Sequence, residues 1–217
     1  MDTPPTHRPL IGITMGDPAG IGPEIVASCL SDKSLRRRGR LVIYGGGAAL
    51  TLACEQIGGR PDWFRACMAD HADKPLTDTP IVLDDDLHGD LLDTPRGPHK
   101  RTGAASKHWV ELAIRDATRA QDDPRKLDAI VTAPISKKAW SLAGFNWPGH
   151  TELLAHRSKA KQVSMVFVSP HLRVALATVH VPLMGVRDIL TIGRVFDAID
   201  RGAQACRLLG IRQPRIA

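Results

Sequence analysis

The 217-residue sequence has few aromatic side chains and no long apolar run. Phe, Trp and Tyr make up 4% of it, with a single Tyr, which is too little to predict a stacking surface for single-stranded nucleic acid. No apolar run approaches the ~20 residues of a membrane-spanning helix, which argues against a transmembrane protein. We therefore expect neither nucleic acid nor a membrane as a partner.

The sequence also lacks the cysteine patterns of metal-binding and disulfide-rich proteins. Its four cysteines, Cys29, Cys54, Cys67 and Cys206, are scattered and form no CxxC pair. Residues 1–9 hold three prolines and lack the apolar segment of a secretory signal. Both absences predict a reduced, cytoplasmic protein.

Basic residues exceed acidic ones by 29 to 23, a net charge of +6, but four of the bases lie in residues 36–40. Without those four, 25 bases face 23 acids and the net charge is +2. Such a cluster could contact nucleic acid, or it could be a solvated connection between a helix and a strand. The scarcity of aromatic residues favours the solvated connection.

The sequence does hold enough apolar residues, 43%, for a buried core, and its length suits one large domain or two small ones. Short apolar runs alternate with helical patterns, which predicts an α/β fold. We place a domain boundary near Thr132. We expect strands over residues 10–15, 41–44, 81–83 and 128–132, and helices over 23–30, from the glycines at 45–47 to about 57, 103–121 and 192–206.

Two further apolar runs, 163–168 and 172–179, are separated only by a turn at 169–171. This spacing predicts an antiparallel pair inside an otherwise alternating pattern, and hence a mixed sheet. The last residues, 214–217, have the composition of the start of a buried strand.

The first candidate site follows the first predicted strand and reads Gly16-Asp17-Pro18-Ala19-Gly20-Ile21-Gly22-Pro23-Glu24. Its glycines allow positive φ angles and a close approach of a ligand to the backbone, and the following helix N-terminus favours an anion or a polar cofactor group. We therefore assign Gly16, Asp17, Gly20 and Gly22 to cofactor binding, although the spacing is neither a Rossmann nor a Walker pattern. The alternative is a tight turn in which the glycines serve the chain geometry alone.

A second glycine-rich segment, Gly45-Gly46-Gly47, follows the next predicted strand. It lacks the third glycine of a dinucleotide-binding fingerprint and the lysine of a phosphate-binding loop. We interpret it as the cap and turn that begin a helix.

A third segment, Thr132-Ala133-Pro134-Ile135-Ser136-Lys137-Lys138, lies at the end of another strand. Lysines at the start of a helix oppose its dipole, so they are better placed facing an anion. Lys137 is therefore a candidate neighbour of a substrate phosphate or carboxylate. The alternative is a lysine pair in solvent.

A fourth segment, Gly149-His150-Thr151-Glu152, offers an imidazole and a hydroxyl to a phosphate or hydroxyl group. The alternative is a helix N-cap at Thr151 beside a surface histidine.

His180 ends the apolar run 172–179 and precedes Val181-Pro182-Leu183. An imidazole at a strand end before a proline-fixed turn suits a metal ligand or a general base. It is one ligand of the three or more that a metal needs, and a satisfied structural histidine is the alternative.

In their order and spacing, the segments at 16–24, 134–137, 149–152 and 180–183 resemble the 4-hydroxythreonine-4-phosphate dehydrogenase family of pyridoxal phosphate biosynthesis. Thr14-Met15 ahead of the first segment is also similar to relatives that act on D-threonate or D-erythronate 4-phosphate.

The resemblance implies a fold similar to isocitrate and isopropylmalate dehydrogenases, with two α/β/α domains around a cleft. Residues 1–132 would be the first domain and 133–217 the start of the second, dimer-forming one. The implied reaction is the oxidation of the secondary alcohol of 4-phosphohydroxy-L-threonine by NAD or NADP, with metal-assisted β-decarboxylation to 3-amino-2-oxopropyl phosphate. The resemblance further implies a divalent metal (Zn, Mg or Co) held by three histidines and a homodimer with a shared active site.

By position, the resemblance makes His150 and Thr151 the substrate-binding pair and His180 a catalytic residue and the first metal ligand. Lys137 becomes the second candidate catalytic residue. Members of the family continue beyond the equivalent of Ala217, where an Asn-Pro-His segment and a later histidine complete the metal site. We therefore expect a fragment or a truncated protein that is inactive alone.

Two other readings stay open from the sequence. One is a dehydrogenase of the same family that acts on a non-phosphorylated cis-dihydrodiol. The other is a non-catalytic binding or dimerising domain, since the chain has one of the three implied metal ligands.

Overall fold

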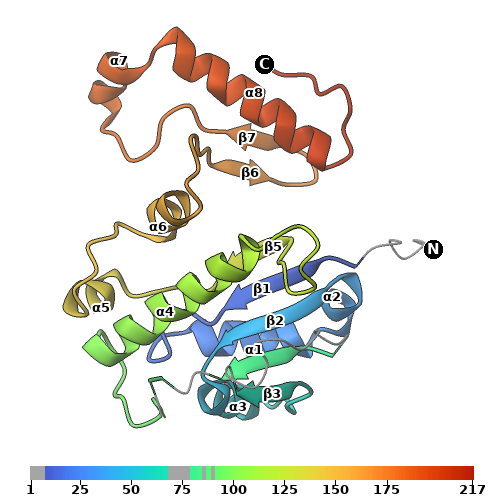
Figure 1. Ribbon diagram of the computed structural model, residues 1–217. Helices are drawn as coiled ribbons and strands as arrows, with labels where there is room; N and C mark the ends of the chain where they lie inside the picture. Colours follow the sequence, from blue (N-terminus) through green and yellow to red (C-terminus); the bar gives the residue numbers. More distant parts are fainter. Residues whose placement is uncertain (1–7, 68–78, 85–86, 89–90) are drawn as a thin grey trace. The chain divides into compact units, whose positions relative to one another are not determined.

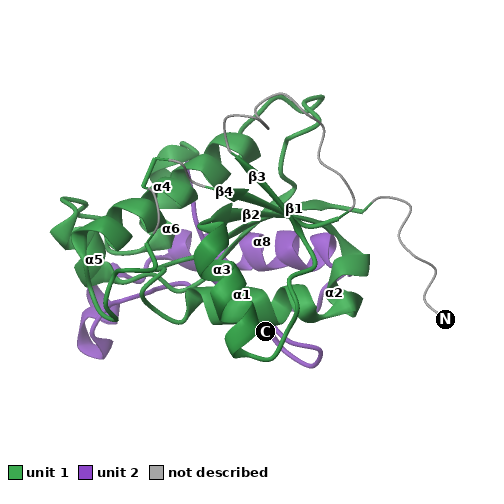
Figure 2. Ribbon diagram, turned by 90° about the horizontal axis from the view of Figure 1, so that it is seen from below, with its two compact units in different colours: residues 1–159 green, residues 160–217 purple. Residues whose placement is uncertain are grey.

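The chain forms two compact units, Met1–Lys159 (unit 1) and Ala160–Ala217 (unit 2), which Figure 2 colours separately. The computed structural model describes residues 8–67, 79–84, 87–88 and 91–217. Residues 1–7, on which the expectation of no secretory signal depends, lie outside this part.

Unit 1 is built on a five-stranded sheet in which each paired strand runs parallel to its neighbour. Its strands are β1 Leu10–Thr14, β2 Arg40–Gly45, β3 Phe64–Cys67, β4 Ile81–Asp84 and β5 Ala129–Thr132. They lie in the order β3-β4-β2-β1-β5 (Figure 1). Thr14 pairs with Tyr44 on one side and with Thr132 on the other, so the carboxyl ends of β1, β2 and β5 meet at one edge.

The inner strands of this sheet are apolar because helices cover both of its faces. Ile43 and Val82 are fully buried, and Ile13 is 9% exposed. β5 lies at an edge of the sheet, and its Ala129 and Val131 are exposed.

The helices of unit 1 are α1 Gly22–Ser31, α2 Lys33–Arg38, α3 Gly47–Gln56, α4 Lys100–Ala117, α5 Lys137–Leu142 and α6 His150–Arg157. Helices α1 and α3 pack together on one face of the sheet, and α4 lies on the other face against β1, β2 and β5 (Figure 2). None of the described helices has the length and apolarity needed to cross a membrane.

Helix α5 packs against α4 at a backbone distance that only glycine allows. A Cβ atom built at Gly103 would lie 2.1 Å from the carbonyl oxygen of Ala139. Beside this crossing, a small apolar cluster buries Val110, Ile114, Trp140 and Leu153. Helices α5 and α6 therefore belong to unit 1.

A buried carboxylate on α4 joins the helix to the sheet. Asp116 is 1% exposed, and its Oδ2 accepts hydrogen bonds from the Tyr44 hydroxyl (2.8 Å) and from buried Arg125 (3.3 Å). Its Oδ1 accepts from the guanidinium groups of Arg119 (2.8 Å) and Arg115 (3.2 Å). Burial, and then the Asp116 charge, raise the pKa of Tyr44 above its ordinary value, so the phenol stays protonated and donates to the carboxylate.

Unit 2 contains a two-stranded antiparallel sheet, β6 Val166–Val168 and β7 Arg173–Ala175. Its other elements are the 3-10 turn Leu183–Gly185, α7 Val186–Ile189 and α8 Ile192–Leu208. The Ser169 hydroxyl accepts a hydrogen bond from the Leu172 amide in the turn between the strands (2.9 Å). Helix α8 packs against β7, with a Cβ atom at Gly202 placed 3.4 Å from Ala175.

Most predicted elements are confirmed. The predicted strands correspond to β1, β2, β4 and β5, and the predicted helices to α1, α3, α4 and α8. Just after α8, Gly210 has a φ of +83°, a conformation that glycine adopts readily at the end of a helix. The predicted antiparallel pair is β6 and β7.

Two expectations are wrong for the described chain. The strands form two sheets, one parallel and one antiparallel, and not a single mixed sheet, because β6 and β7 pair only with each other. Residues 214–217 form no strand. The compact units divide after Lys159, since α5 and α6 pack on α4, whereas the boundary after Thr132 stays a prediction about the domains of a longer protein.

The basic cluster lies where a helix leads into a strand, as the sequence favoured: Arg36, Arg37 and Arg38 are in the last turn of α2, and Arg40 begins β2. No residue of α2 is buried. Arg36 pairs with Asp62 at 2.6 Å, which places one of the four bases in an ion pair.

Replacing Asp116 tests the buried carboxylate. Asp116→Ala leaves Arg125 without this carboxylate in a buried place, so we expect a loss of about 3–5 kcal/mol in the free energy of unfolding. Urea denaturation measures this loss. Asp93→Ala, which removes an exposed partner of Arg101, is the matched control, with an expected loss under about 1 kcal/mol. Equal losses in the two variants would contradict the assigned role of Asp116.

Candidate functional site

The loop after β1 touches the chain that leaves β5. Gly16 has a φ of +77°, and a Cβ atom there would lie 2.3 Å from the carbonyl oxygen of Pro134. The Asp17 amide donates to that oxygen (2.9 Å), and the Ala133 amide donates to the carbonyl of Thr14 (2.9 Å). The first and third sequence segments therefore meet at the carboxyl edge of the sheet, where open α/β sheets bind ligands.

Asp17 holds the shape of this loop. Its side chain is buried, and its Oδ1 accepts a hydrogen bond from the Ala19 amide (3.0 Å). Its carbonyl oxygen accepts from the Gly20 amide (3.0 Å). The carboxylate is thus turned to its own loop.

The other two glycines of the loop differ in their surroundings. A Cβ atom at Gly22 would lie 2.0 Å from the carbonyl oxygen of Met15, so the packing of the chain itself requires glycine there, as it does at Gly16. Gly20 is exposed and lies two residues before α1 begins. The assignment of Gly16, Asp17, Gly20 and Gly22 to cofactor binding stays a prediction.

Gly45-Gly46-Gly47 leads into α3, as predicted, with Gly45 ending β2, Gly46 as the N-cap and Gly47 as the first helical residue. The Gly47 amide donates to Oδ1 of Asp84, the last residue of β4, and Arg65 pairs with the same carboxylate. A carboxylate of the protein therefore occupies this helix N-terminus, in agreement with a cap and turn.

The lysine segment begins α5 and approaches the histidine segment. The Ser136 hydroxyl caps α5 by accepting from the Ala139 amide (3.1 Å). Lys137 and Lys138 are both exposed. Cε of Lys137 lies 3.8 Å from a Cβ atom built at Gly149, so the Lys137 side chain passes beside the residue that precedes His150.

His150 is the first residue of α6 and is half-buried. Burial lowers the pKa of its imidazole below the ordinary value of 6.5, so the neutral ring prevails at neutral pH. Its Nε2 is buried with no hydrogen-bond partner among the described residues. A substrate oxygen beside the ring could supply that partner.

Thr151 is exposed on α6, and the N-cap of the helix is Gly149, not Thr151. The N-cap alternative for Thr151 is therefore wrong, because the helix begins two residues earlier than that reading requires. The hydroxyl lies in the first turn, next to His150.

The sequence did not single out Trp140, whose ring lies 5.6 Å from that of His150 at an angle of 74°. Trp140 is fully buried, and its Nε1 donates to the Ser106 hydroxyl on α4 (3.0 Å). Nothing in the spacing of these residues indicates the contact, because it depends on how α5 packs on α4.

His180 belongs to unit 2. It lies five residues beyond the end of β7 and not at the strand end, because β7 ends at Ala175. It is exposed, with a φ of +54° that is uncommon for a residue other than glycine. Within the residues that the structure describes, no three His, Cys, Asp or Glu side chains gather as a metal site would need.

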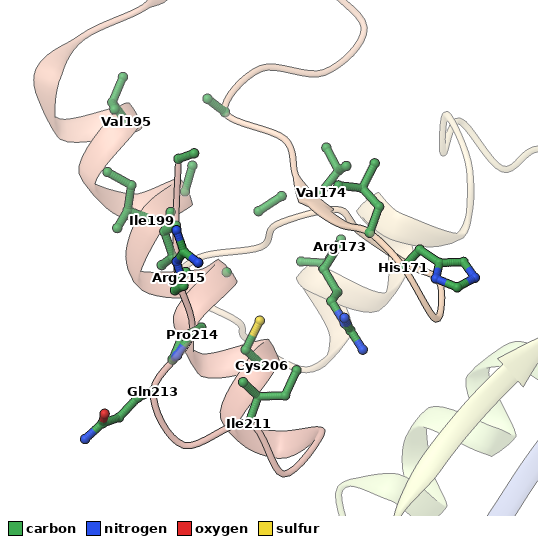
Figure 3. Close-up of a pocket in the computed structure, with 18 residues that line it drawn as sticks. His171, Arg173, Val174, Val195, Ile199, Cys206, Ile211, Gln213, Pro214 and Arg215 are labelled. Atoms are coloured by element: carbon green, nitrogen blue, oxygen red, sulfur yellow. The ribbon is translucent and has the colours of Figure 1, made fainter.

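Unit 2 also has a pocket of about 750 Å³ (Figure 3). Its walls are apolar side chains of β7 and α8, among them Val174 and Ile199, and the segment from Ile211 to Ala217. Arg173 and Arg215 are the charged residues that line it. None of the predicted site residues lines this pocket.

The sequence matches one protein family and several of its members. The family model described as "Pyridoxal phosphate biosynthetic protein PdxA" matches residues 50–217. The D-threonate 4-phosphate dehydrogenase of Cupriavidus necator is 36% identical over 211 residues, which are 97% of this chain and 61% of that protein. The 4-hydroxythreonine-4-phosphate dehydrogenase of a Nostoc species is 34% identical over 197 residues, which are 88% of this chain and 51% of that protein.

A solved structure of similar fold is the 4-hydroxythreonine-4-phosphate dehydrogenase of Burkholderia phymatum, with a TM-score of 0.78 and 32% identity. The match covers 97% of this chain and 62% of that one. This chain thus spans between half and two thirds of the length of these relatives. The α/β fold, the order of the segments and the matched family model lead to one conclusion: the chain belongs to the PdxA family of pyridoxal phosphate biosynthetic proteins.

Proposed function

We propose that the protein is a dehydrogenase that oxidises the secondary alcohol of a 4-phosphorylated hydroxy acid, with 4-phosphohydroxy-L-threonine as the leading substrate. The observation that carries the proposal is the approach of Lys137 to Gly149-His150 in a member of this family. In the proposed reaction a hydride leaves the alcohol carbon and a proton leaves its hydroxyl, which yields a ketone. The bond between the neighbouring carbon and its carboxylate then breaks, so that carbon dioxide leaves, the electron pair passes to the ketone as an enolate, and the enolate takes up a proton.

Three side chains of unit 1 are suited to hold the phosphate. Lys137 is exposed and supplies a cation. His150, neutral at neutral pH, supplies a buried ring nitrogen without a partner among the described residues, and Thr151 supplies a hydroxyl on the same helical turn. Together they offer charge and two hydrogen bonds to one anionic group.

For the oxidation, NAD or NADP accepts the hydride when it is bound. The part of the loop after β1 that fits such a cofactor is exposed Gly20, two residues before α1 begins. Gly16, Gly22 and Asp17 would act by keeping that loop close to Pro134.

The fit to a metal is incomplete. His180 supplies one imidazole, and the described residues bring no group of three metal-binding side chains together. We therefore derive no step through a metal and propose His180 only as one ligand of Zn, Mg or Co in a longer protein. The homodimer with a shared active site, the isocitrate dehydrogenase-like two-domain architecture and the cytoplasmic location likewise stay predictions, as does the inactivity of these 217 residues alone.

D-threonate 4-phosphate is the second candidate substrate, since two relatives with that activity in their names are 36% and 37% identical to this chain. A terephthalate cis-dihydrodiol dehydrogenase structure is 21% identical with a TM-score of 0.62, which supports the fold alone. No observation on the described residues specifically supports a dihydrodiol substrate or a non-catalytic binding domain.

Substrate choice is tested with the protein expressed from its complete gene. NAD or NADP reduction is followed with 4-phosphohydroxy-L-threonine, D-threonate 4-phosphate and a cis-dihydrodiol, each with added Zn²⁺, Mg²⁺ or Co²⁺. We expect turnover of a phosphorylated substrate, because Lys137 and His150 offer an anion site. Faster turnover of the dihydrodiol would contradict the proposal, and binding without any turnover would favour the non-catalytic reading.

The lysine pair provides a matched test of the phosphate contact. Lys137→Ala is expected to weaken binding of 4-phosphohydroxy-L-threonine roughly 10- to 100-fold, the effect of losing a charge-assisted hydrogen bond. Lys138→Ala removes the same charge one residue away and should leave affinity within about twofold. Calorimetric titration measures both affinities. Equal effects would show that Lys137 contributes only general charge.

The metal assignment is tested by metal content. In the protein expressed from its complete gene, His180→Ala is expected to lower bound Zn²⁺ per chain, since one ligand of the site is lost. His171→Ala, which removes another exposed histidine of unit 2, is the control and should retain the metal. Unchanged metal content in His180→Ala would remove this residue from the ligand set.

A further inference from the structure

The tryptophan beside His150 is held by two linked hydrogen bonds. Nε1 of Trp140 donates to the Ser106 hydroxyl (3.0 Å), and that hydroxyl donates to the carbonyl oxygen of Gly103 (3.2 Å). Both side chains are fully buried. Because the hydroxyl proton is directed to Gly103, a hydroxyl lone pair is free to accept the indole N–H. The two bonds therefore fix the rotation of the indole on α5 relative to α4.

The Trp140 ring contacts the imidazole of His150 and can hold its orientation. The two ring centroids are 5.6 Å apart and the rings are nearly perpendicular, an arrangement that aromatic pairs prefer. His150 has no hydrogen bond at Nε2 to orient it among the described residues. Its orientation therefore depends on packing, and Trp140 is the aromatic ring in contact with it.

We propose that Ser106 and Trp140 are positioning residues for His150, acting through the indole ring to set the direction of the imidazole. The inference rests on the proposed function, in which His150 contacts the substrate phosphate. A change at Ser106, on another helix and under the protein surface, would thus reach the substrate through two contacts.

Charged groups around His150 do not take part in these contacts. The ionisable side chains on the surrounding helices are Lys137, Lys138, Glu152, His156 and Arg157 on α5 and α6, and Lys100, Arg101, Lys107, His108, Glu111, Arg115 and Asp116 on α4. Glu152 approaches Gly149, with Oε2 3.5 Å from a Cβ atom built there, and Glu111 pairs with Lys107 (2.6 Å). Ser106→Ala removes none of these charges, so a changed titration of His150 reports on the setting of its ring.

The test compares the titration of His150 by NMR in the wild type, in Ser106→Ala and in Ser158→Ala. Ser158 is the matched control, since its hydroxyl also donates to a backbone carbonyl, that of Leu154 (2.7 Å), but it is the exposed C-cap of α6. In Ser106→Ala the indole loses its anchor, and we expect the pKa of His150 to move toward 6.5 with a changed chemical shift at Cε1. We expect no change in Ser158→Ala.

A purely structural serine would lower stability without moving the His150 resonances, so unchanged resonances in folded Ser106→Ala would overturn the proposal. If Ser106→Ala does not fold, the proposal is tested in the wild type. Titration of His150 should then shift the indole N–H resonance of Trp140, whereas Trp147 should follow His156, whose ring it contacts at 4.9 Å. A Trp140 indole N–H resonance that stays unchanged while His150 titrates would overturn the proposal.

A second readout separates this inference from the proposed function. In Ser106→Ala the affinity for 4-phosphohydroxy-L-threonine should fall roughly tenfold, the size of one misplaced hydrogen bond to a charged group. If the His150 resonances move but the affinity stays, the positioning stands and the substrate role of His150 is wrong.

Discussion

The contact between Gly16 and Pro134 is the constraint on which the candidate site depends. β1 and β5 run parallel as neighbours, so the loop that leaves one strand must pass the segment that leaves the other. The two backbones approach so closely that no side chain fits at Gly16, and the Asp17 amide donates to Pro134 across the gap. This contact fixes the start of the segment that carries Lys137, and Lys137 in turn lies beside Gly149.

Helix α4 supports the elements that carry the candidate site. It rests on β1, β2 and β5, it is joined to β2 by the buried Asp116 and Tyr44, and it accepts α5 at Gly103. The same helix carries Ser106, which holds Trp140 beside His150. Stability and site geometry are therefore linked through one element, and a change within α4 can act on the site without touching it.

Much of unit 1 could be predicted from the sequence because each step rests on local patterns. β1, β2 and β4 are short apolar runs, and the glycines at 16–22 follow a strand directly. β3 could not be predicted in the same way, because Phe64 and Arg65 are exposed and its four residues form no apolar run. The pairing of β6 with β7 was evident from the short turn, but their separation from the parallel sheet was not, since local sequence does not state which strands pair at long range.

The sequence proposed Lys137 and His150 as substrate contacts in separate segments, and those roles stay predictions. Their approach beside Gly149, the contact of His150 with Trp140 and the inward direction of Asp17 could not be predicted, because they depend on packing. The central claim is that residues 16–22, 132–138 and 149–151 form one site, in which the last two segments hold the substrate beside the cofactor loop 16–22. Amide chemical shifts of the protein during titration with 4-phosphohydroxy-L-threonine test it most directly. The account predicts saturable shifts in all three segments with a single affinity, and shifts confined to one segment or to unit 2 would contradict it.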